Sequence, residues 1–317
     1  YRVNGLSLGS GSVANSNITA TGYVFNNIIS NIQAPNVVAT NLYTATYLAI
    51  SDLGSFTAAF YKIFNNTFYN EANAPFFFIY SNGLHPNNAF ELRNNIMMVN
   101  TAPGYVNTMP GVLYGTNFGT ENSLSSLSSN NIYFSNFEIF RWVMKGNPTP
   151  NTVSGYNTFA QYRTSRPGEQ TSQFTNLNFT DLNFYYLNGV NPGTATITGV
   201  PSTIPGLGLP SNLVNFDFNG YRRVASNPTI GANELITLVS AINISGGTQI
   251  NNYRGSIQLN ASILPANATY NDFTWSVANQ DIATISGSGS LTALGGKDGV
   301  VRVIATAGDG SKITGLY

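Results

Sequence analysis

The residues of this sequence best suited to bind a ligand are aromatic and basic side chains gathered between positions 141 and 163. The set comprises Arg141, Trp142, Lys145, Tyr162 and Arg163. An aromatic face can stack on the CH groups of a sugar ring, while Arg and Lys donate hydrogen bonds to its hydroxyls. The set therefore predicts a glycan-binding patch. The alternative is that Trp142 packs beneath a loop and that the cations pair with Glu138 and Glu169.

Residue types that common catalytic sites need are scarce. The chain has one histidine, His85, and no cysteine. A Ser-His-Asp triad would have to use His85, which lies in a loop-like stretch, and one His without Cys cannot fill a typical zinc site. The acidic residues up to Glu234 form no cluster of the kind that glycosidases or calcium sites require. We therefore predict no catalytic residue, no metal site and no cofactor, and expect a binding or structural protein rather than an enzyme.

Composition narrows the class of partner. Charged residues make up 8% of the chain, and 13 basic residues balance 13 acidic ones. Such a chain lacks the clustered basic charge that nucleic acids attract, so we expect no nucleic-acid partner. No run approaches the ~18 apolar residues of a membrane-spanning helix. Polarity comes from Asn, Thr, Ser and Gly, which together with Val, Ile, Phe and Tyr indicate short strands joined by many turns.

A short pattern recurs along the first part of the chain: Asn-Asn, a brief apolar or aromatic stretch, and often a closing Asn. Its first Asn stands at 26, 65, 94 and 130, so the spacings are 39, 29 and 36 residues. A weaker fifth copy lies within 176–184. A period of this size with a strand in each copy is typical of a stacked solenoid.

Stacking gives the repeated residues definite roles. Each short strand would pair with its counterparts above and below, and Ile28, Phe68, Ile96 and Tyr133 or their neighbours would form an apolar column. Asn at each corner tolerates left-handed backbone angles. Stacked Asn side chains can also hydrogen-bond to one another along the axis.

This region resembles the right-handed parallel β-helix proteins of the pectate-lyase-like class. A second part of the resemblance is Asp217-Phe218-Asn219-Gly220-Tyr221-Arg222-Arg223, followed by Pro228-Thr229-Ile230-Gly231-Ala232-Asn233-Glu234. Many secreted β-helix proteins end their last coil in this way, which implies a boundary near Glu234. Because the repeats begin almost at residue 1, we expect the N-terminal cap of the solenoid to be missing and the chain to be a piece of a longer precursor. The intervening stretches 101–128, 145–172 and 191–212 are expected to be loops.

From about Leu235 the pattern becomes regular alternation with closely spaced turns, as in a β-sandwich. This part resembles the bacterial immunoglobulin-like domain, group 2. The resemblance is carried by the stretches 264–269, 273–276, 281–286, 289–293, 301–306 and 309–311. It implies that Trp275 is a core aromatic residue.

Together these patterns predict an all-β chain: a right-handed parallel β-helix over residues 1–234 and an immunoglobulin-like β-sandwich over residues 235–317. We expect a secreted or cell-surface bacterial protein, extracellular or associated with the outer membrane. Its expected function is non-enzymatic, with an adhesive or glycan-binding role. The expected partners are a polysaccharide or another cell-surface component, and other surface proteins. Two alternatives stay open: a polysaccharide lyase or related carbohydrate-active enzyme on the same scaffold, and a structural subunit of an extracellular filament or surface layer.

Overall fold

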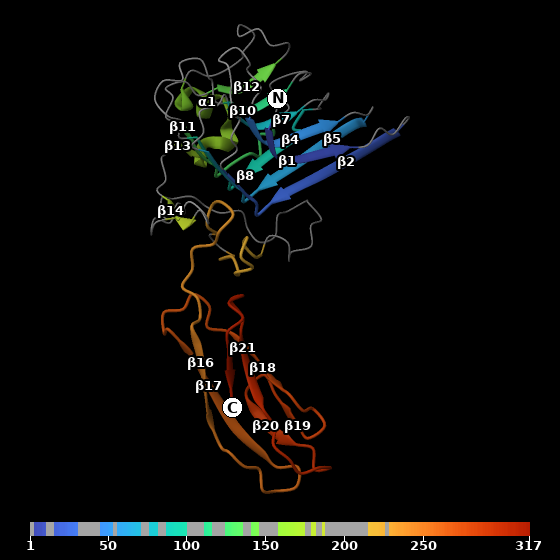
Figure 1. The fold of residues 1–317 in the computed structure, drawn as a ribbon, viewed down its shortest axis with the longest axis vertical. Helices are drawn as coiled ribbons and strands as arrows, with labels where there is room; N and C mark the ends of the chain where they lie inside the picture. The colour runs from blue at the N-terminus through green and yellow to red at the C-terminus, as the bar shows by residue number, and fades with distance from the viewer. Residues whose placement is uncertain are drawn as a thin grey trace. The chain divides into compact units, whose positions relative to one another are not determined.

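The computed structural model divides the chain into two compact units. The N-terminal unit comprises Tyr1–Phe218 and Arg223–Glu234, and the C-terminal unit comprises Asn219–Arg222 and Leu235–Tyr317 (Figure 1). The structure describes residues 3–10, 16–30, 45–52, 56–70, 76–81, 87–99, 111–115, 124–135, 141–145, 158–174, 179–181, 186–187, 215–225 and 228–317. The expected loop at 191–212 and the only histidine, His85, lie outside these ranges.

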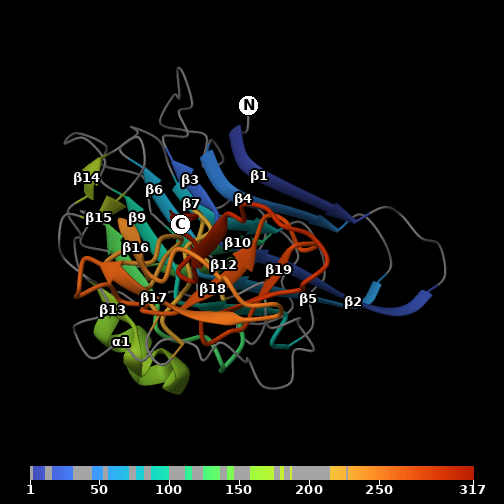
Figure 2. The same ribbon diagram turned by 90° about the horizontal axis from the view of Figure 1, so that it is seen from below.

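Three parallel sheets make up most of the described N-terminal unit. The first has the order β1 (Val3–Ser10), β4 (Ala45–Asp52), β7 (Phe76–Ser81), β10 (Gly111–Gly115) and β12 (Arg141–Lys145). The second has the order β2 (Ser16–Phe25), β5 (Phe56–Phe64) and β8 (Phe90–Arg93). The third joins β3 (Ile28–Ser30), β6 (Thr67–Asn70), β9 (Ile96–Val99), β11 (Ile132–Ser135) and β13 (Gln173–Phe174). Successive passes of the chain add successive strands to these sheets, and Figure 2 shows β3, β6 and β9 side by side.

The predicted stacking of the four Asn-bordered segments is confirmed by the third sheet. Ile28, Thr67, Ile96 and Ile132 are aligned across parallel neighbours. The first Asn of each pair forms the corner that precedes this sheet, with φ of 56° at Asn26, 53° at Asn65, 54° at Asn94 and 55° at Asn130. Asn is one of the few residues that adopts this left-handed conformation readily, which explains why it recurs here.

The second Asn of each pair forms a hydrogen-bonded ladder. The side-chain Nδ2 donates to the Oδ1 of the next ladder residue, at 2.9 Å from Asn27 to Asn66, 3.0 Å from Asn66 to Asn95 and 3.0 Å from Asn95 to Asn131. The backbone N–H of each donor residue reaches the same Oδ1 at 3.0–3.1 Å. Asn66, Asn95 and Asn131 are fully buried, so the ladder satisfies polar groups inside the protein.

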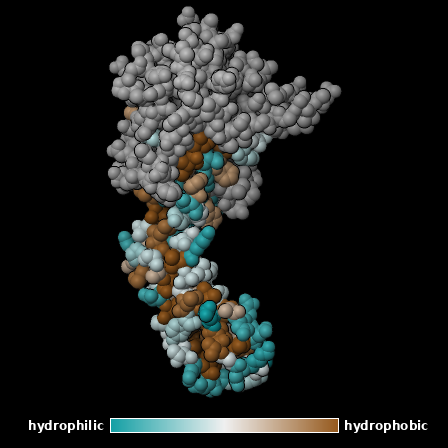
Figure 3. All heavy atoms as spheres, in the orientation of Figure 1, coloured by the Kyte–Doolittle hydropathy of each residue, from teal (hydrophilic) through white to brown (hydrophobic). Residues whose placement is uncertain are grey.

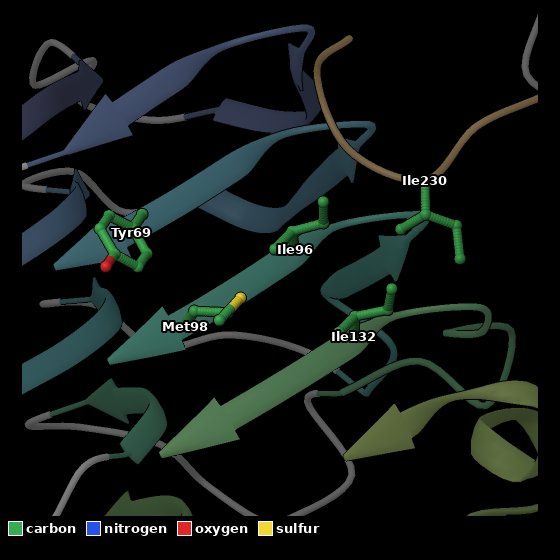
Figure 4. Close-up of a cluster of buried hydrophobic side chains, with 5 residues drawn as sticks. All are labelled: Tyr69, Ile96, Met98, Ile132 and Ile230. Carbon is green, nitrogen blue, oxygen red and sulfur yellow. The ribbon is translucent and has the colours of Figure 1, made fainter. Parts of the chain in front are cut away.

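Apolar side chains cover both faces of the third sheet, and their register corrects the expected column. Ile28, Thr67, Ile96 and Ile132 share one column. Phe68 and Tyr133 belong to the neighbouring column, with Met97 between them. The expected column therefore runs through the neighbours Thr67 and Ile132 in place of Phe68 and Tyr133, because adjacent strand residues point to opposite faces. On the first face Tyr69, Ile96, Met98, Ile132 and Ile230 form one buried cluster (Figure 4).

The fifth strand of the stack is not where the weak fifth copy suggested. β13 begins at Gln173, and Thr171 and Ser172 stand where the other copies have Asn-Asn. Within the suggested copy, β14 (Phe179–Asp181) pairs antiparallel with β15 (Tyr186–Leu187). Two of the expected loops are not entirely loop. The stretch 101–128 contains the strand β10, and the stretch 145–172 contains the helix α1 (Phe159–Ser165) and the 3₁₀ helix η2 (Pro167–Thr171). Within the described ranges, no helix has the length and hydrophobicity to cross a lipid bilayer.

The C-terminal unit contains two antiparallel sheets. One has the order β16 (Ala241–Gly246), β17 (Ser256–Leu264), β20 (Ser290–Ala293) and β19 (Ala283–Ile285). The other has the order β18 (Phe273–Val277), β21 (Val303–Ala307) and β22 (Thr314–Leu316). Alternate residues of these strands form two buried clusters, and the half-buried Trp275 packs against both, as its expected place in the core implies. The face of this unit shown in Figure 3 carries hydrophobic and hydrophilic residues intermixed.

Residues Asn219–Arg222 group with the C-terminal unit, and Arg222 makes three contacts with that unit. Its backbone N–H donates to the Asp309 carbonyl at 2.8 Å, and its guanidinium pairs with Asp272 at 2.9 Å. The same guanidinium lies 4.3 Å from the centre of the Tyr270 ring. Asp309 in turn accepts hydrogen bonds from the backbone of Val239 and Ser311, which connects the segment just before β16 to the turn between β21 and β22.

Replacing a central ladder residue, Asn95→Ala, should lower the free energy of unfolding of the N-terminal unit by about 3 kcal/mol. The change leaves the backbone and amide donors of Asn66 without their buried acceptor, and it removes one of the two donors to Asn131 Oδ1. Urea denaturation read by hydrogen–deuterium exchange of peptides 65–70 and 94–99 measures the loss. Asn243→Ala, at an exposed position on β16, is the control and should change stability by less than about 0.5 kcal/mol. Equal effects of the two substitutions would contradict the role given to the ladder.

Candidate functional site

The five residues predicted to bind glycans come from two elements. Arg141, Trp142 and Lys145 lie on β12, which pairs in parallel with β10 at the end of the first sheet. Tyr162 and Arg163 lie on α1. The side chains of β12 lie outside the described part of the structure, so only Tyr162 and Arg163 have a described environment.

Tyr162 is the buried residue of α1 and has none of its surface exposed. Its ring contacts Tyr133 edge-on at 6.4 Å between centroids and Phe159 at 5.9 Å. Helix α1 is fixed at its start by Thr158, whose hydroxyl accepts a hydrogen bond from the Gln161 N–H at 3.2 Å, as an N-cap residue does. The described geometry therefore gives Tyr162 a packing role, and the five-residue patch as a whole stays a prediction.

Arg163 is half-buried and engaged with its own neighbourhood. Its guanidinium donates to the Gln170 carbonyl at 2.5 Å, and the Gln170 side-chain amide donates back to the Arg163 carbonyl. The alternative interpretation paired the cations with Glu138 and Glu169. Glu138 lies outside the described ranges, and Glu169 accepts hydrogen bonds from uncharged side chains that include Tyr133 and Asn131.

A buried polar cluster that the sequence did not reveal surrounds Glu169. The Tyr133 hydroxyl donates to Glu169 Oε1 at 3.2 Å, and Asn131 Nδ2 lies 3.4 Å from the same oxygen. Burial raises the pKa of Glu169, although hydrogen bonds from its neighbours oppose the shift. Burial, followed by the nearby charge of Glu169, also raises the pKa of Tyr133 and Tyr162.

This Glu169 cluster closes the asparagine ladder. Asn131 has no fifth Asn above it; its backbone N–H donates to Ser172 Oγ at 2.8 Å. The chain can approach closely here because residue 168 is glycine: a Cβ at Gly168 would lie 2.1 Å from the Ser126 carbonyl oxygen. The cluster therefore ends a structural network, and its buried carboxylate serves packing and hydrogen bonding.

A second buried charged cluster is centred on Arg223 and Glu234. Their side chains pair at 3.0 Å, and both residues are buried. Arg223 Nη2 also donates to the carbonyls of Gly231 and Ala232 and to Asn26 Oδ1, all within 3.0 Å. Burial raises the pKa of Glu234 and lowers that of Arg223, while their mutual attraction opposes both shifts.

The Arg223–Glu234 pair fastens the segment 228–234 to the third sheet. The Gly231 N–H donates to the Asn94 carbonyl at 2.8 Å, and the Ala232 N–H donates to Thr67 Oγ1 at 3.0 Å. Gly231 has a φ of 96°, and a Cβ there would lie 2.6 Å from Ile96, so only glycine suits this position. Asp217 and Arg223 from the first motif are thus placed together with Ile230–Glu234 from the second as a structural clasp.

Glu91, on β8, is a further acid of the parallel sheets and is buried between two cations. It pairs with Lys62 on β5 and with Arg93 two residues along β8, the latter at 2.5 Å. Glu91, Glu169, Asp217 and Glu234 are thus each held by structural partners. Among the residues that the structure describes, no three His, Cys, Asp or Glu side chains gather into a metal-binding group.

Glu169→Gln should flatten the dependence of N-terminal stability on pH. A carboxyl group whose pKa is raised in the folded state contributes fully below its unfolded value of about 4.5, and that contribution is lost as pH rises through the folded value. The wild type should therefore lose stability relative to Glu169→Gln as pH rises from 4.5. Urea denaturation across pH 4–8 tests this. Asp281→Asn, at an exposed acid, should keep the wild-type slope; an unchanged slope for Glu169→Gln would contradict the assignment.

Arg223→Met should destabilise the N-terminal unit by about 3–5 kcal/mol, because it leaves the Glu234 carboxylate buried without its cation. The double variant Arg223→Met/Glu234→Met should recover part of this loss. Urea denaturation of the four proteins in a double-mutant cycle measures the coupling. Arg302→Met, at an exposed position, is the control. Simple additivity of the two single losses would show that the pair is not coupled.

Comparison with known proteins identifies the C-terminal unit. Residues 239–315 match the family described as Bacterial Ig-like domain (group 2). The predicted family of this region is thereby confirmed, in agreement with the two antiparallel sheets found there.

One protein with a similar sequence is the tail tube protein pb6 of Escherichia phage T5. The two sequences are 32% identical over 99 residues, which cover 30% of this chain and 21% of that protein. The chain thus matches only about a fifth of the length of this curated relative. Both similarities point to a surface or structural protein and are compatible with an extracellular location. Within the chain, residues 239–315 belong to the bacterial immunoglobulin-like domains of group 2.

Proposed function

We propose that this chain is a non-enzymatic extracellular or cell-surface protein with an adhesive, glycan-binding role. In this proposal residues 1–234 are a right-handed parallel β-helix that presents the binding surface, and residues 235–317 are a spacer or attachment module. The β-helix assignment is supported by three sheets of parallel strands to which successive passes of the chain contribute. The attachment role is supported by the family match of residues 239–315.

The proposal that the protein is not an enzyme is supported by the partners of its buried acidic residues. Glu91, Glu169 and Glu234 are each buried and bound to structural partners. Glycoside cleavage and lyase chemistry both require acidic groups that face a substrate or a metal ion. Glu91, Glu169 and Glu234 instead hold parts of the N-terminal unit together. The lyase alternative therefore rests on analogy of fold, which does not determine function.

A second function is favoured by one specific observation. The similarity to a phage tail tube protein supports a role as a structural subunit of an extracellular filament or surface layer. The low charge of the chain, with 8% charged residues, is compatible with extended contacts between protein surfaces. Both functions would use the same fold. In the second, the binding partner would be a protein rather than a glycan.

A glycan array probed with the full chain tests the first function. Trp142→Ala should weaken binding to any glycan found by about tenfold, since it removes the proposed stacking face, a loss of about 1.4 kcal/mol. Tyr253→Ala is the matched control, because it removes a 75%-exposed aromatic side chain from the C-terminal unit and should leave binding unchanged. Unchanged binding by Trp142→Ala would discard the patch. Fibres seen by electron microscopy, with no glycan bound, would favour the filament function.

A further inference from the structure

One sheet of the C-terminal unit is built without charge. Its four strands, β16, β17, β20 and β19, contain neither a charged nor an aromatic residue. Alternate residues such as Ile242, Ile244 and Ile263 pack against the core. The residues between them lie on the outer face of the sheet. This outer face therefore carries Ser, Thr, Asn and Gln side chains, together with Ala241 and Leu264.

Part of the outer face satisfies its own hydrogen bonds. The Gln258 side-chain amide donates to the carbonyls of Leu259 and Ser288, both at 2.7 Å. The hydroxyls of Ser256 and Thr292, which lie opposite each other on β17 and β20, share a hydrogen bond of 2.7 Å. The polar side chains at this end of the face are thus engaged within the sheet.

A block of four polar side chains on β16 and β17 is different. Asn243 lies opposite Ser262, and Ser245 lies opposite Asn260. All four residues are exposed, and in the described structure none of their side chains hydrogen-bonds to another residue. An Asn amide and a Ser hydroxyl each combine donor and acceptor groups. This polar block therefore offers donors and acceptors side by side to a partner.

An apolar pair borders the polar block. Ala241 and Leu264 lie opposite each other and form the next outer pair along β16 and β17. Leu264 has 43% of its surface exposed, and Ala241 is half-buried. A partner that fits both features must carry apolar surface beside uncharged groups that donate and accept hydrogen bonds.

We propose that residues 241–245 and 260–264 form a binding site for a neutral sugar chain. Each sugar hydroxyl both donates and accepts hydrogen bonds, which matches the mixed groups of the polar block, and the CH groups of the ring supply the apolar surface that Leu264 contacts. The sugar is neutral because the four strands provide no cation to pair with a uronate or a sulfate group.

Other classes of partner suit this face less well. The centre of a protein–protein interface is enriched in aromatic residues, Met and Arg and depleted in Ser, which is the reverse of what the polar block contains. Nucleic acids and anionic membranes require clustered basic residues. The uncharged, hydrogen-bonding character of the face thus favours a sugar.

This inference rests on the attachment role proposed for residues 235–317 and names the chemical partner of that attachment. It is separate from the patch that contains Trp142, which lies on β12. The two sites can therefore be tested independently in the full chain.

Isothermal titration calorimetry of the full chain with maltohexaose, cellohexaose and chitohexaose tests the site, with hexagalacturonate as the acidic counterpart. At least one neutral sugar should bind, and hexagalacturonate should not bind at this site. The affinity should change by less than about twofold between about 0.05 and 0.5 M NaCl, because no charge pairs are formed.

Ser262→Arg should weaken this binding at least about tenfold, because it places a bulky cation in the middle of the polar block. Ser276→Arg is the matched control, since it introduces the same residue at an exposed serine of β18, in the other sheet, and should leave the affinity unchanged. Asn260→Asp keeps the size of the side chain but replaces its donor by a negative charge, and should weaken binding about tenfold.

Binding of none of the neutral sugars would overturn the proposal, as would equal affinities for Ser262→Arg and Ser276→Arg or wild-type affinity for Asn260→Asp. Trp142→Ala separates this site from the earlier patch. Loss of binding in Trp142→Ala with full binding in Ser262→Arg would overturn this inference and leave the proposed function standing. The reverse result would support this inference and discard the patch.

Discussion

The N-terminal unit depends on the hydrogen bonds between stacked asparagine side chains. Each buried ladder residue meets the needs of its neighbours' backbone and amide groups at once, so the coils must lie in one register. A slip of one residue would leave several buried polar groups without partners, each at a cost of about 1–3 kcal/mol. The left-handed corner residues and the aligned strands β3, β6, β9 and β11 are arranged around this constraint.

Two further polar clusters complete the packing around the sheet that carries the ladder. The Glu169 cluster ends the ladder with a serine hydroxyl and a carboxylate, while the Arg223–Glu234 pair holds the segment 228–234 across the face that carries Ile96. Both place charged groups in the interior, where burial is unfavourable unless hydrogen bonds are complete. The buried acids Glu169 and Glu234 thus serve the architecture of this unit.

The C-terminal unit is stabilised differently. Alternating apolar residues of two antiparallel sheets form its core, and short-range polar contacts such as those of Asp309 close its turns. This core depends on the alternation of apolar and polar residues within each strand, whereas the N-terminal unit depends on identical residues stacked across strands. It is the construction expected of an immunoglobulin-like β-sandwich, and the match of residues 239–315 to a bacterial immunoglobulin-like domain family agrees with it.

The sequence by itself determined the features that local chemistry controls. Repeated Asn-Asn pairs predicted left-handed corners and a stacked ladder, since few other residues suit both roles, and regular alternation predicted the sandwich. Only the tertiary structure decided which residues share a column, because Phe68 and Ile96 are both apolar and differ only in the face to which they point. It alone also showed that Thr171 and Ser172 replace the fifth asparagine pair, and that Glu169 closes the ladder. Those contacts join residues some 38–41 positions apart, and no local pattern specifies which distant side chain will meet a buried donor.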